Sequence, residues 1–273
     1  MGLKFTKMHG IGNDFVLVDV RRDDPGGWPE LARKLGHRKF GVGCDQVLLL
    51  RDSDRADFRM EIYNSDGSEV EMCGNGIRCF SVYLKKHGLI AGDEVRVETL
   101  AGVQICRIEG DMVEVDMGSP ILEGRKIPVE SDSPVREQPL ALKDATLVIT
   151  CVSMGNPHAI VFVEDAETYP IEIVGPEVEN HSFFPRRTNV EFVQVQSRTK
   201  LRMRVWERGA GITMACGTGA CASAVAAYWT GRTERECELV LDGGSLFIRW
   251  DAETDHVFMR GPAAEVFSGE WLL

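Results

Sequence analysis

The chain repeats itself at a fixed offset of 143 residues, and this repeat limits the possible folds more than any other feature of the sequence. Two glycine-rich loops, each led by a cysteine, lie that far apart (216 − 73 = 143): Cys73-Gly74-Asn75-Gly76 and Cys216-Gly217-Thr218-Gly219. With no gap inserted, the same offset joins Gly12 to Gly155, Asn13 to Asn156, Gln46 to Asn189, residues 58–63 to 201–206, Gly88 to Gly231 and Gly118 to Gly261. One folding unit is therefore encoded twice.

A duplicated unit with a duplicated loop predicts a paired active site. If two such units pack about a pseudo-twofold axis, Cys73 and Cys216 can face each other across one cleft. Two equivalent side chains on opposite sides of one carbon atom suit a reaction that treats both faces of that carbon alike. The repeat thus favours a racemase or an epimerase.

The length of 273 residues fits two domains, and the repeat divides them better than any linker does. We expect the first domain at 1–118 and the second from 119 onward. A connector is predicted at 127–142, where Pro128, Pro134 and Pro139 stand among scattered charges. Hydrophobic residues make up 44% of the chain, which is sufficient for real cores and argues against disorder.

Charge and cysteine usage exclude several classes of partner. The net charge of −11 leaves no basic stripe for phosphate contacts, so no nucleic-acid partner is expected. No apolar run is long enough for a membrane span, and no secretory signal core is present. Eight cysteines in a chain of ordinary core composition need no disulfide framework, which favours reduced thiols and a cytoplasmic location.

Hydrophobic patterning predicts the same order of elements in both halves. The first half reads as a strand at 3–20, a helix after Trp28-Pro29, strands at 47–50 and 58–64, a loop at 65–76, a buried helix at 77–87 ended by Gly88, and a meander at 95–115. The second half reads as strands at 146–163 and 201–207, a small-residue helix at 220–230 ended by Gly231, and a meander at 238–259.

Both cysteine loops are predicted to precede a helix, where unpaired N–H groups and the helix dipole stabilise an anion. We therefore expect a lowered pKa for the thiols of Cys73 and Cys216, and a binding site for a substrate carboxylate beside them. Most single cysteines are small buried hydrophobes, and Cys106, Cys151 and Cys237 are interpreted in this way.

Motifs for metals and cofactors are weak or missing. The chain has no Cys-x-x-Cys and no His-Glu-x-x-His, so a metal site is not expected. Residues 217–222 formally match a dinucleotide fingerprint, but the preceding strand ends about ten residues too early. No phosphate loop occurs and no lysine stands out as a Schiff-base candidate. The sequence predicts chemistry without a cofactor.

Four segments together resemble the diaminopimelate epimerase family, and the resemblance covers nearly the whole chain. They are Gly12-Asn13-Asp14-Phe15, residues 64–69 leading into 72–78, Ser153-Met154-Gly155-Asn156-Pro157-His158, and Glu207-Arg208-Gly209-Ala210-Gly211 leading into 215–219. Proline racemases share the cysteine loops but not the first or last of these segments. The resemblance implies interconversion of LL- and meso-diaminopimelate without pyridoxal phosphate, on the route to lysine and peptidoglycan.

The resemblance also implies roles for individual residues. Cys73 and Cys216 are the two bases, one acting as thiolate and the other returning a proton from a thiol. His158 and Glu207 tune the thiols, while Gly74, Asn75, Gly217 and Thr218 bind the reacting carboxylate. The remaining substrate-binding positions are Asn13, Gln46, Asn64, Asn156, Asn189 and Arg208, with Glu207 counted among them as well.

Agreement and difference between the halves refine these roles. Matching pairs such as Asn13 and Asn156 should serve the symmetric reacting carbon. Differing pairs, such as Ser65 and Arg208, should recognise what makes the substrate asymmetric, so Arg208 is expected to bind the distal carboxylate. Cys44 departs from the family pattern and is expected to add a reactive side chain near Gln46.

The expected fold is α+β, with two homologous domains related by a pseudo-twofold axis and the site in the cleft between them. Each domain should be a curved, mostly antiparallel sheet wrapped around a central helix. By resemblance, a last strand at 263–273 returns to the first domain, which leaves the second at 119–262. The resemblance also implies a homodimer, in which Phe267 stands where a tyrosine is expected.

Two other functions remain open at this point. A proline- or hydroxyproline-type racemase would not need Arg208 or the asparagines for turnover. A non-catalytic thiol switch or amino-acid-binding protein on the same fold would catalyse no hydrogen exchange at the α-carbon of its ligand.

Overall fold

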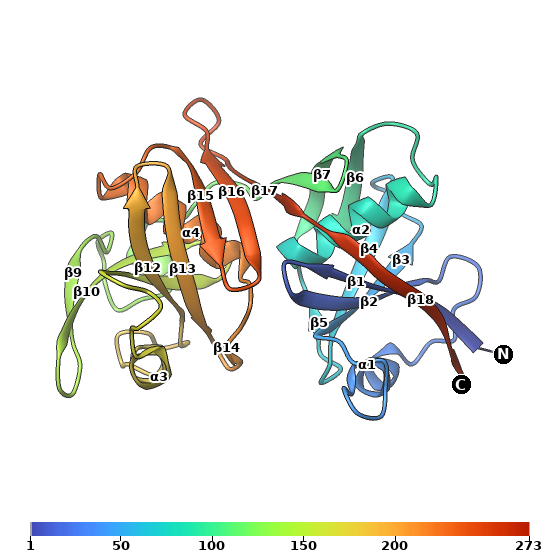
Figure 1. Ribbon diagram of the computed structural model, residues 1–273, viewed down its shortest axis with the longest axis horizontal. Helices are drawn as coiled ribbons and strands as arrows, with labels where there is room; N and C mark the ends of the chain where they lie inside the picture. The colour runs from blue at the N-terminus through green and yellow to red at the C-terminus, as the bar shows by residue number, and fades with distance from the viewer. Residues whose placement is uncertain (1, 273) are drawn as a thin grey trace. The chain divides into compact units, whose positions relative to one another are not determined.

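A computed structural model describes residues 2–272. Met1, where the predicted first domain begins, and Leu273, where the predicted returning strand ends, lie outside the described residues. The chain forms two compact units (Figure 1). One contains the residues up to Asp116 together with those from Arg260 onward, and the other is Met117–Met259. Each unit combines helices with a mostly antiparallel sheet, which confirms the predicted α+β class.

The first unit carries α1 and α2 and most of the early strands. Its elements are β1 (Gly2–Gly10), β2 (Asn13–Asp19), α1 (Trp28–Gly36), β3 (Gln46–Arg51), β4 (Phe58–Asn64), β5 (Glu69–Val70), α2 (Gly74–Lys86), β6 (Glu94–Thr99), β7 (Gly102–Glu109), β8 (Met112–Asp116) and β18 (Ala264–Leu272). Strands β2 and β3 are parallel, as are β4 and β6. The pairs β1–β18, β1–β2, β3–β4, β4–β5, β6–β7 and β7–β8 are antiparallel.

The second unit repeats this layout. Its elements are a 3-10 turn (Gly124–Lys126), β9 (Gln138–Ala141), β10 (Thr146–Ser153), β11 (Pro157–Val163), α3 (Ile171–Glu179), β12 (Asn189–Ser197), β13 (Lys200–Glu207), β14 (Gly211–Ile212), α4 (Gly217–Trp229), β15 (Glu236–Leu241) and β16 (Gly244–Trp250). The chain then returns to the first unit through β17 (Val257–Pro262).

The structural repeat follows the sequence repeat closely. Helices α1 and α3 begin and end 143 residues apart, and so do α2 and α4. In the parallel strand pairs, Phe15 lies opposite Gln46 and His158 lies opposite Asn189, again at the same offset. Equivalent side chains therefore occupy equivalent places within their own units.

Strand β18 completes the first sheet from the far end of the chain. It runs antiparallel to β1, with Lys4 opposite Glu270 and Thr6 opposite Ser268, and lies beside β1 in Figure 1. In the second unit β9 takes the same place next to β10. The strand that pairs with β1 thus comes from the C-terminal end of the chain, whereas the strand that pairs with β10 directly precedes it in the sequence.

Strands near the middle of each sheet are apolar on both faces because helices cover both. In β3, Val47 and Leu49 pack into the core beneath α1, whose buried residues Trp28, Ala32 and Leu35 recur with helical spacing. Alternate side chains point to the opposite face, where Leu48 approaches Gly76 of α2. Unbroken apolar runs are expected for strands buried on both sides.

Helices α2 and α4 are the central helices of their units. Ten residues of each are buried, which agrees with the predicted buried helices. Both begin three residues earlier than predicted, at Gly74 and Gly217, because the glycine loops themselves form the first helical turn. The residues just past their ends, Gly88 and Gly231, have φ of 66° and 77°, as a glycine following a helix commonly does.

Several sequence predictions were wrong in detail. The strand predicted at 3–20 is two strands, broken by a turn in which Gly12 has φ 88°, and the strand predicted at 146–163 is likewise two strands, β10 and β11. The predicted connector at 127–142 belongs to the second unit, since Ile127, Val129 and Val135 are buried in its core and β9 joins its sheet. Helix α3 had no prediction, because Gly175 and Pro176 hide its pattern.

Candidate active site

Cys73 stands at the N-cap of α2, the position at which a side chain meets the unpaired N–H groups of a helix. Its Sγ accepts a hydrogen bond from Gly76 N at 3.4 Å and lies 3.8 Å from Asn13 Oδ1. Asn75 Nδ2 donates to the same Asn13 oxygen at 3.1 Å. The structure thus joins Cys73, Asn13 and Asn75 in one hydrogen-bonded group.

A charged network behind Asn13 fixes which way its amide points. Asn13 Nδ2 donates to Asp45 Oδ2 at 2.8 Å, which leaves Asn13 Oδ1 facing the cysteine loop. Arg38 bridges Asp45 and Asp14, and Lys7 donates to Asp14 as well. Burial alone would raise the pKa of Asp14, but the hydrogen bonds from Arg38 and Lys7 outweigh it and lower that pKa to about 2.

Gln46 and Asn64 meet at the end of the same sheet. Gln46 begins β3, Asn64 ends β4, and the two residues lie opposite each other in the strand pair. Gln46 Nε2 donates to Asn64 Oδ1 at 2.9 Å, and Asn64 Nδ2 donates to Ser68 Oγ at 3.0 Å. Four predicted amide side chains of the first unit are therefore held by hydrogen bonds at strand or helix ends.

In the second unit Cys216 stands at the N-cap of α4, the position equivalent to Cys73. Its Sγ lies 3.6 Å from Thr218 Oγ1. Beside it, His158 Nδ1 lies 2.7 Å from Glu191 Oε1, and His158 Nε2 lies 3.0 Å from Asn156 Oδ1. The ligating atoms of His158, Glu191 and Cys216 all lie within 4.8 Å of one another.

The expectation of a lowered thiol pKa was wrong for Cys216. Burial, followed by the negative charges of Glu207 and Glu191, raises the pKa of this thiol well above its usual value. The helix N-terminus is present, but the thiol has too little water around it and carboxylates too close to it. Cys216 is therefore expected to carry its proton at neutral pH.

Asn189, Glu207 and Arg208 lie together at the ends of β12 and β13. Asn189 Oδ1 accepts from Arg208 N at 2.9 Å, and Asn189 Nδ2 donates to Pro157 O at 3.0 Å. Glu207 accepts a hydrogen bond from Thr213 Oγ1. The guanidinium of Arg208 is exposed and donates to the Arg186 carbonyl at 3.2 Å, so it lies at the surface of its unit.

Glu191 is the site residue that the sequence analysis missed. It lies in β12 between apolar neighbours, and its side chain is completely buried. Its partner at the repeat offset is Leu48 (191 − 143 = 48). A charged residue whose repeat partner is a core leucine is a signal that could have found it, because an ionised group is rarely buried without a specific partner.

The group of His158, Glu191 and Cys216 offers the kinds of atom that bind zinc. In this structure the ring nitrogens of His158 are already engaged, one by Glu191 and the other by Asn156. A metal ion bound by His158 would have to replace one of these hydrogen bonds. The second carboxylate oxygen of Glu191, Oε2, is buried with no hydrogen-bond partner among the described residues.

Cys44 does not add a reactive thiol, contrary to expectation. It is 2% exposed, and burial raises its pKa to about 12. Cys106, Cys151 and Cys237 are buried as predicted. Burial raises the pKa of Cys106 and Cys237 to about 12, so these thiols stay protonated at neutral pH.

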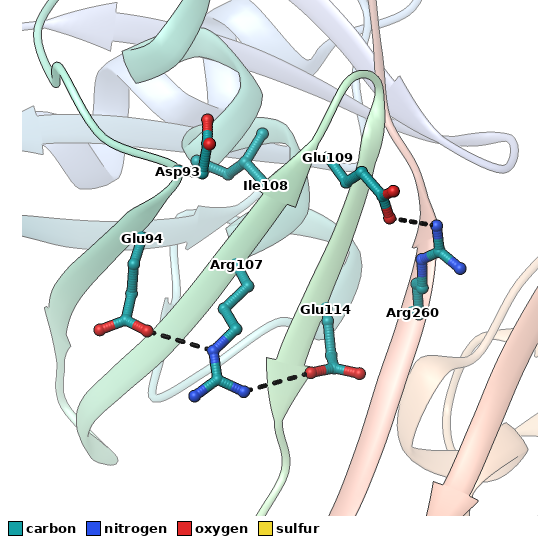
Figure 2. Close-up of a pocket in the computed structure, with 7 residues that line it drawn as sticks. All are labelled: Asp93, Glu94, Arg107, Ile108, Glu109, Glu114 and Arg260. Carbon is teal, nitrogen blue, oxygen red and sulfur yellow. Dashed lines mark hydrogen bonds and ion pairs between the residues drawn. The ribbon is translucent and has the colours of Figure 1, made fainter.

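An open hollow of about 520 Å³ lies elsewhere on the first unit, along β6, β7 and β8 (Figure 2). Arg107 lies between Glu94 and Glu114, and Arg260 pairs with Glu109 at 2.6 Å. Its lining contains no thiol and none of the predicted site residues. Ion pairs therefore account for most of the charged side chains that line the hollow.

Among residues 2–272, no helix combines the length and the apolar character that a bilayer span requires.

Comparison with known proteins gives a consistent result over nearly the full length. A family model described as diaminopimelate epimerase matches residues 5–123 and 150–266. The chain is 54% identical to the diaminopimelate epimerase of Moorella thermoacetica, covering 99% of this chain and 100% of that protein. It is 52% identical to the diaminopimelate epimerase of Desulfitobacterium hafniense, covering 98% and 97% respectively.

Solved structures with low sequence identity share the fold. A hydroxyproline epimerase from Agrobacterium vitis, solved with trans-4-hydroxy-L-proline, superposes with a TM-score of 0.72 at 16% identity, covering 100% of this chain and 93% of that one. A phenazine biosynthesis protein of the PhzF family from Enterococcus faecalis gives a TM-score of 0.73 at 13% identity and covers both chains completely.

Proposed function

Because this chain belongs to the diaminopimelate epimerase family, we propose that it interconverts LL- and meso-2,6-diaminopimelate by a two-base mechanism that needs no cofactor. The observation that carries the mechanism is the equivalent placement of Cys73 and Cys216, each at the N-cap of the central helix of its unit. Two identical acid–base groups are what inversion at a single carbon requires.

The proposed reaction moves one proton onto the enzyme and another off it. In one direction the Cys73 thiolate removes the α-proton and becomes a thiol, leaving the electron pair on the α-carbon. The Cys216 thiol then donates its proton to the opposite face and becomes a thiolate. The reverse reaction starts from Cys73 protonated and Cys216 ionised, so each thiol serves both as acid and as base.

The environment of Cys216 supports the role of proton donor in the substrate-free enzyme. Its thiol is buried close to two carboxylates, which disfavour a third negative charge. Cys73 is half-buried, and its Sγ contacts a backbone N–H and a neutral amide. We therefore assign the proton to Cys216 in the substrate-free enzyme.

The reacting carboxylate is assigned to the first turns of α2 and α4. These turns contain no acidic residue, and the unpaired N–H groups of a helix N-terminus favour an anion. Holding the carboxylate there also stabilises the charge that develops on the α-carbon. Asn75 and Thr218 provide side-chain donors beside the same turns.

The distal end of the substrate is assigned to Arg208, with Asn64, Asn156, Asn189 and Glu207 completing the polar contacts. Arg208 is exposed and its backbone is held by Asn189. A planar guanidinium binds a carboxylate through two parallel hydrogen bonds. This contact would allow the enzyme to distinguish diaminopimelate from amino acids that lack a second carboxylate.

We further propose that the protein acts in the cytoplasm as a homodimer within lysine biosynthesis. The exposed side of β18, with Val266 and Phe267 about half exposed, is consistent with a contact between copies.

Purified protein incubated with LL-diaminopimelate in heavy water, with no cofactor added, tests the proposal. Early in the reaction the meso product should carry deuterium at the inverted carbon, because its new proton comes from a thiol that exchanges with solvent. Recovered LL substrate should remain largely protonated. Equal early deuteration of substrate and product would point to a single base, and no deuteration at all would contradict the proposed function.

A further inference from the structure

Glu179, the last residue of α3, contacts the turn that carries Arg208. Three donors converge on this carboxylate. Its Oε1 accepts from Gly209 N at 2.9 Å and from Arg187 Nη1 at 3.1 Å, and its Oε2 accepts from Trp206 Nε1 at 2.7 Å. The side chain is only 6% exposed, so these bonds are shielded from water.

Nothing in α3 itself favours an acidic residue at this position. A negative charge at the C-terminal end of a helix is opposed by the helix dipole. The last turn of α3 contains no basic side chain that would offset it. The contacts that stabilise Glu179 therefore come from outside the helix: from Trp206 and Gly209, on either side of Arg208, and from Arg187 in the loop after α3.

The helix is also pressed unusually close to that segment. A Cβ placed on Gly175 would lie 2.6 Å from Trp206 Cγ, so only glycine allows α3 to approach this tightly. In the facing loop Arg187, which bonds Glu179, has φ 58°, a left-handed conformation that non-glycine residues seldom adopt. Such backbone strain persists where the surrounding contacts hold it in place.

Hydrogen bonds hold both the backbone and the side chain of Arg208. Its own N–H donates to Asn189, the next N–H along the chain donates to Glu179, and its Nη1 donates to the carbonyl of Arg186. The backbone around the guanidinium is thus fixed on both sides by side chains of the second unit.

The first unit has neither the glutamate nor the arginine at the equivalent positions. The residue equivalent to Glu179 is Gly36 (179 − 143 = 36), and the residue equivalent to Arg208 is Ser65 (208 − 143 = 65). A Cβ on Gly36 would lie 2.8 Å from Ser65 Cβ, so that helix end packs directly on the turn with no carboxylate between them. The glutamate and the arginine are present together in one half and missing together from the other.

We propose that Glu179 is a positioning residue that sets specificity by holding the Arg208 turn in the conformation that binds the distal carboxylate. This inference rests on the proposed function. Glu179 does not touch the thiols, and its effect is confined to the part of the site that recognises the substrate's far end.

The test compares Glu179→Gln with Glu177→Gln in the full chain. Glutamine is nearly isosteric, but its NH2 group must face a donor, either Trp206 Nε1 or the N–H of Gly209. Glu177 is a matched control two residues away on α3, whose Oε1 accepts from Lys143 N at 2.6 Å and does not contact the turn. Steady-state kinetics on diaminopimelate and amide hydrogen exchange at Gly209 are measured for both.

We expect Glu179→Gln to raise KM for diaminopimelate by at least about tenfold, because a buried charged acceptor is lost. Exchange at Gly209 should accelerate by at least about tenfold as well, while Glu177→Gln stays close to wild type. Trp206→Phe, which removes one donor and keeps the carboxylate, should raise KM by a smaller factor. It also serves as a second test if Glu179→Gln does not fold.

The inference is overturned if the wild type turns over diaminopimelate but Glu179→Gln matches Glu177→Gln in KM, or if exchange at Gly209 does not change. Absence of turnover in the wild type would instead contradict the proposed function. In that case exchange at Gly209 still decides whether Glu179 holds the turn.

Discussion

His158 Nδ1 lies 2.7 Å from Glu191 Oε1, and neither side chain has any exposed surface. With Asn156 Oδ1 on the other ring nitrogen, His158 faces an oxygen acceptor on each side. The two contacts together fix the orientation of the imidazole ring of His158, which lies beside the thiol of Cys216.

Replacing Glu191 with glutamine should impair the reaction more than substrate binding. The variant keeps the shape of the side chain but replaces one carboxylate oxygen beside His158 with an NH2 group, which disturbs the contact that orients the imidazole ring. We expect kcat to fall by about a hundredfold, within the range of acid–base effects, with little change in KM. Glu177→Gln is again the control. A kcat for Glu191→Gln equal to that of the control would show that Glu191 has no role in the reaction.

The thiols should differ sharply in their reactivity in the native protein. Cys73 is half-buried, while the seven other cysteines are buried, and the pKa of Cys44 is raised to about 12. Iodoacetamide at neutral pH should therefore modify Cys73 first, with Cys44 protected until the protein unfolds. Peptide mapping by mass spectrometry follows each site. Modification of Cys44 at a rate similar to that of Cys73 would contradict the burial argument.

Asp14 should contribute to stability in a defined range of pH. Its folded pKa of about 2 lies below its ordinary value of 3.8. The contribution is therefore fully present above pH 4 or so and is lost as the pH falls through the folded value. Unfolding by urea is measured for wild type and Asp14→Asn from neutral to acidic pH. The stability difference between them should shrink only at the acidic end, and a constant difference would refute the assignment.

Arg208→Lys tests how the distal carboxylate is recognised. Lysine keeps the charge but loses the planar fork that binds a carboxylate at two points. We expect kcat/KM on diaminopimelate to fall by at least about tenfold, although both cysteines are unchanged. Wild type should act poorly on lysine, which lacks the distal carboxylate. Comparable wild-type rates on both amino acids would favour a broader racemase.

Much of the fold follows from the sequence repeat together with the apolar pattern. The buried helices and the strand at 58–64 are visible because their residues are uniformly apolar or regularly spaced. Helix α3 was missed because Gly175 and Pro176 disfavour a helix locally, whereas tertiary packing on Trp206 requires the glycine. The repeat itself would have located this helix, since α1 and α3 share the 143 offset.

The site could be predicted only in part. Residues in the glycine loops and at strand ends were identified from their types and from the family resemblance. The pKa of Cys216 could not be, because it depends on burial and on Glu191 and Glu207, which the fold brings close to the sulfur. Glu191 and Glu179 act through long-range contacts that no local motif records.

The most direct test of the two-base mechanism is the initial rate of epimerisation of LL-diaminopimelate by Cys73→Ala and Cys216→Ala, measured with the wild type under identical conditions. Each variant lacks either the group that removes the proton or the group that returns it. The mechanism predicts that both variants lose at least about a hundredfold in rate while remaining folded. A near wild-type rate in either variant would contradict it.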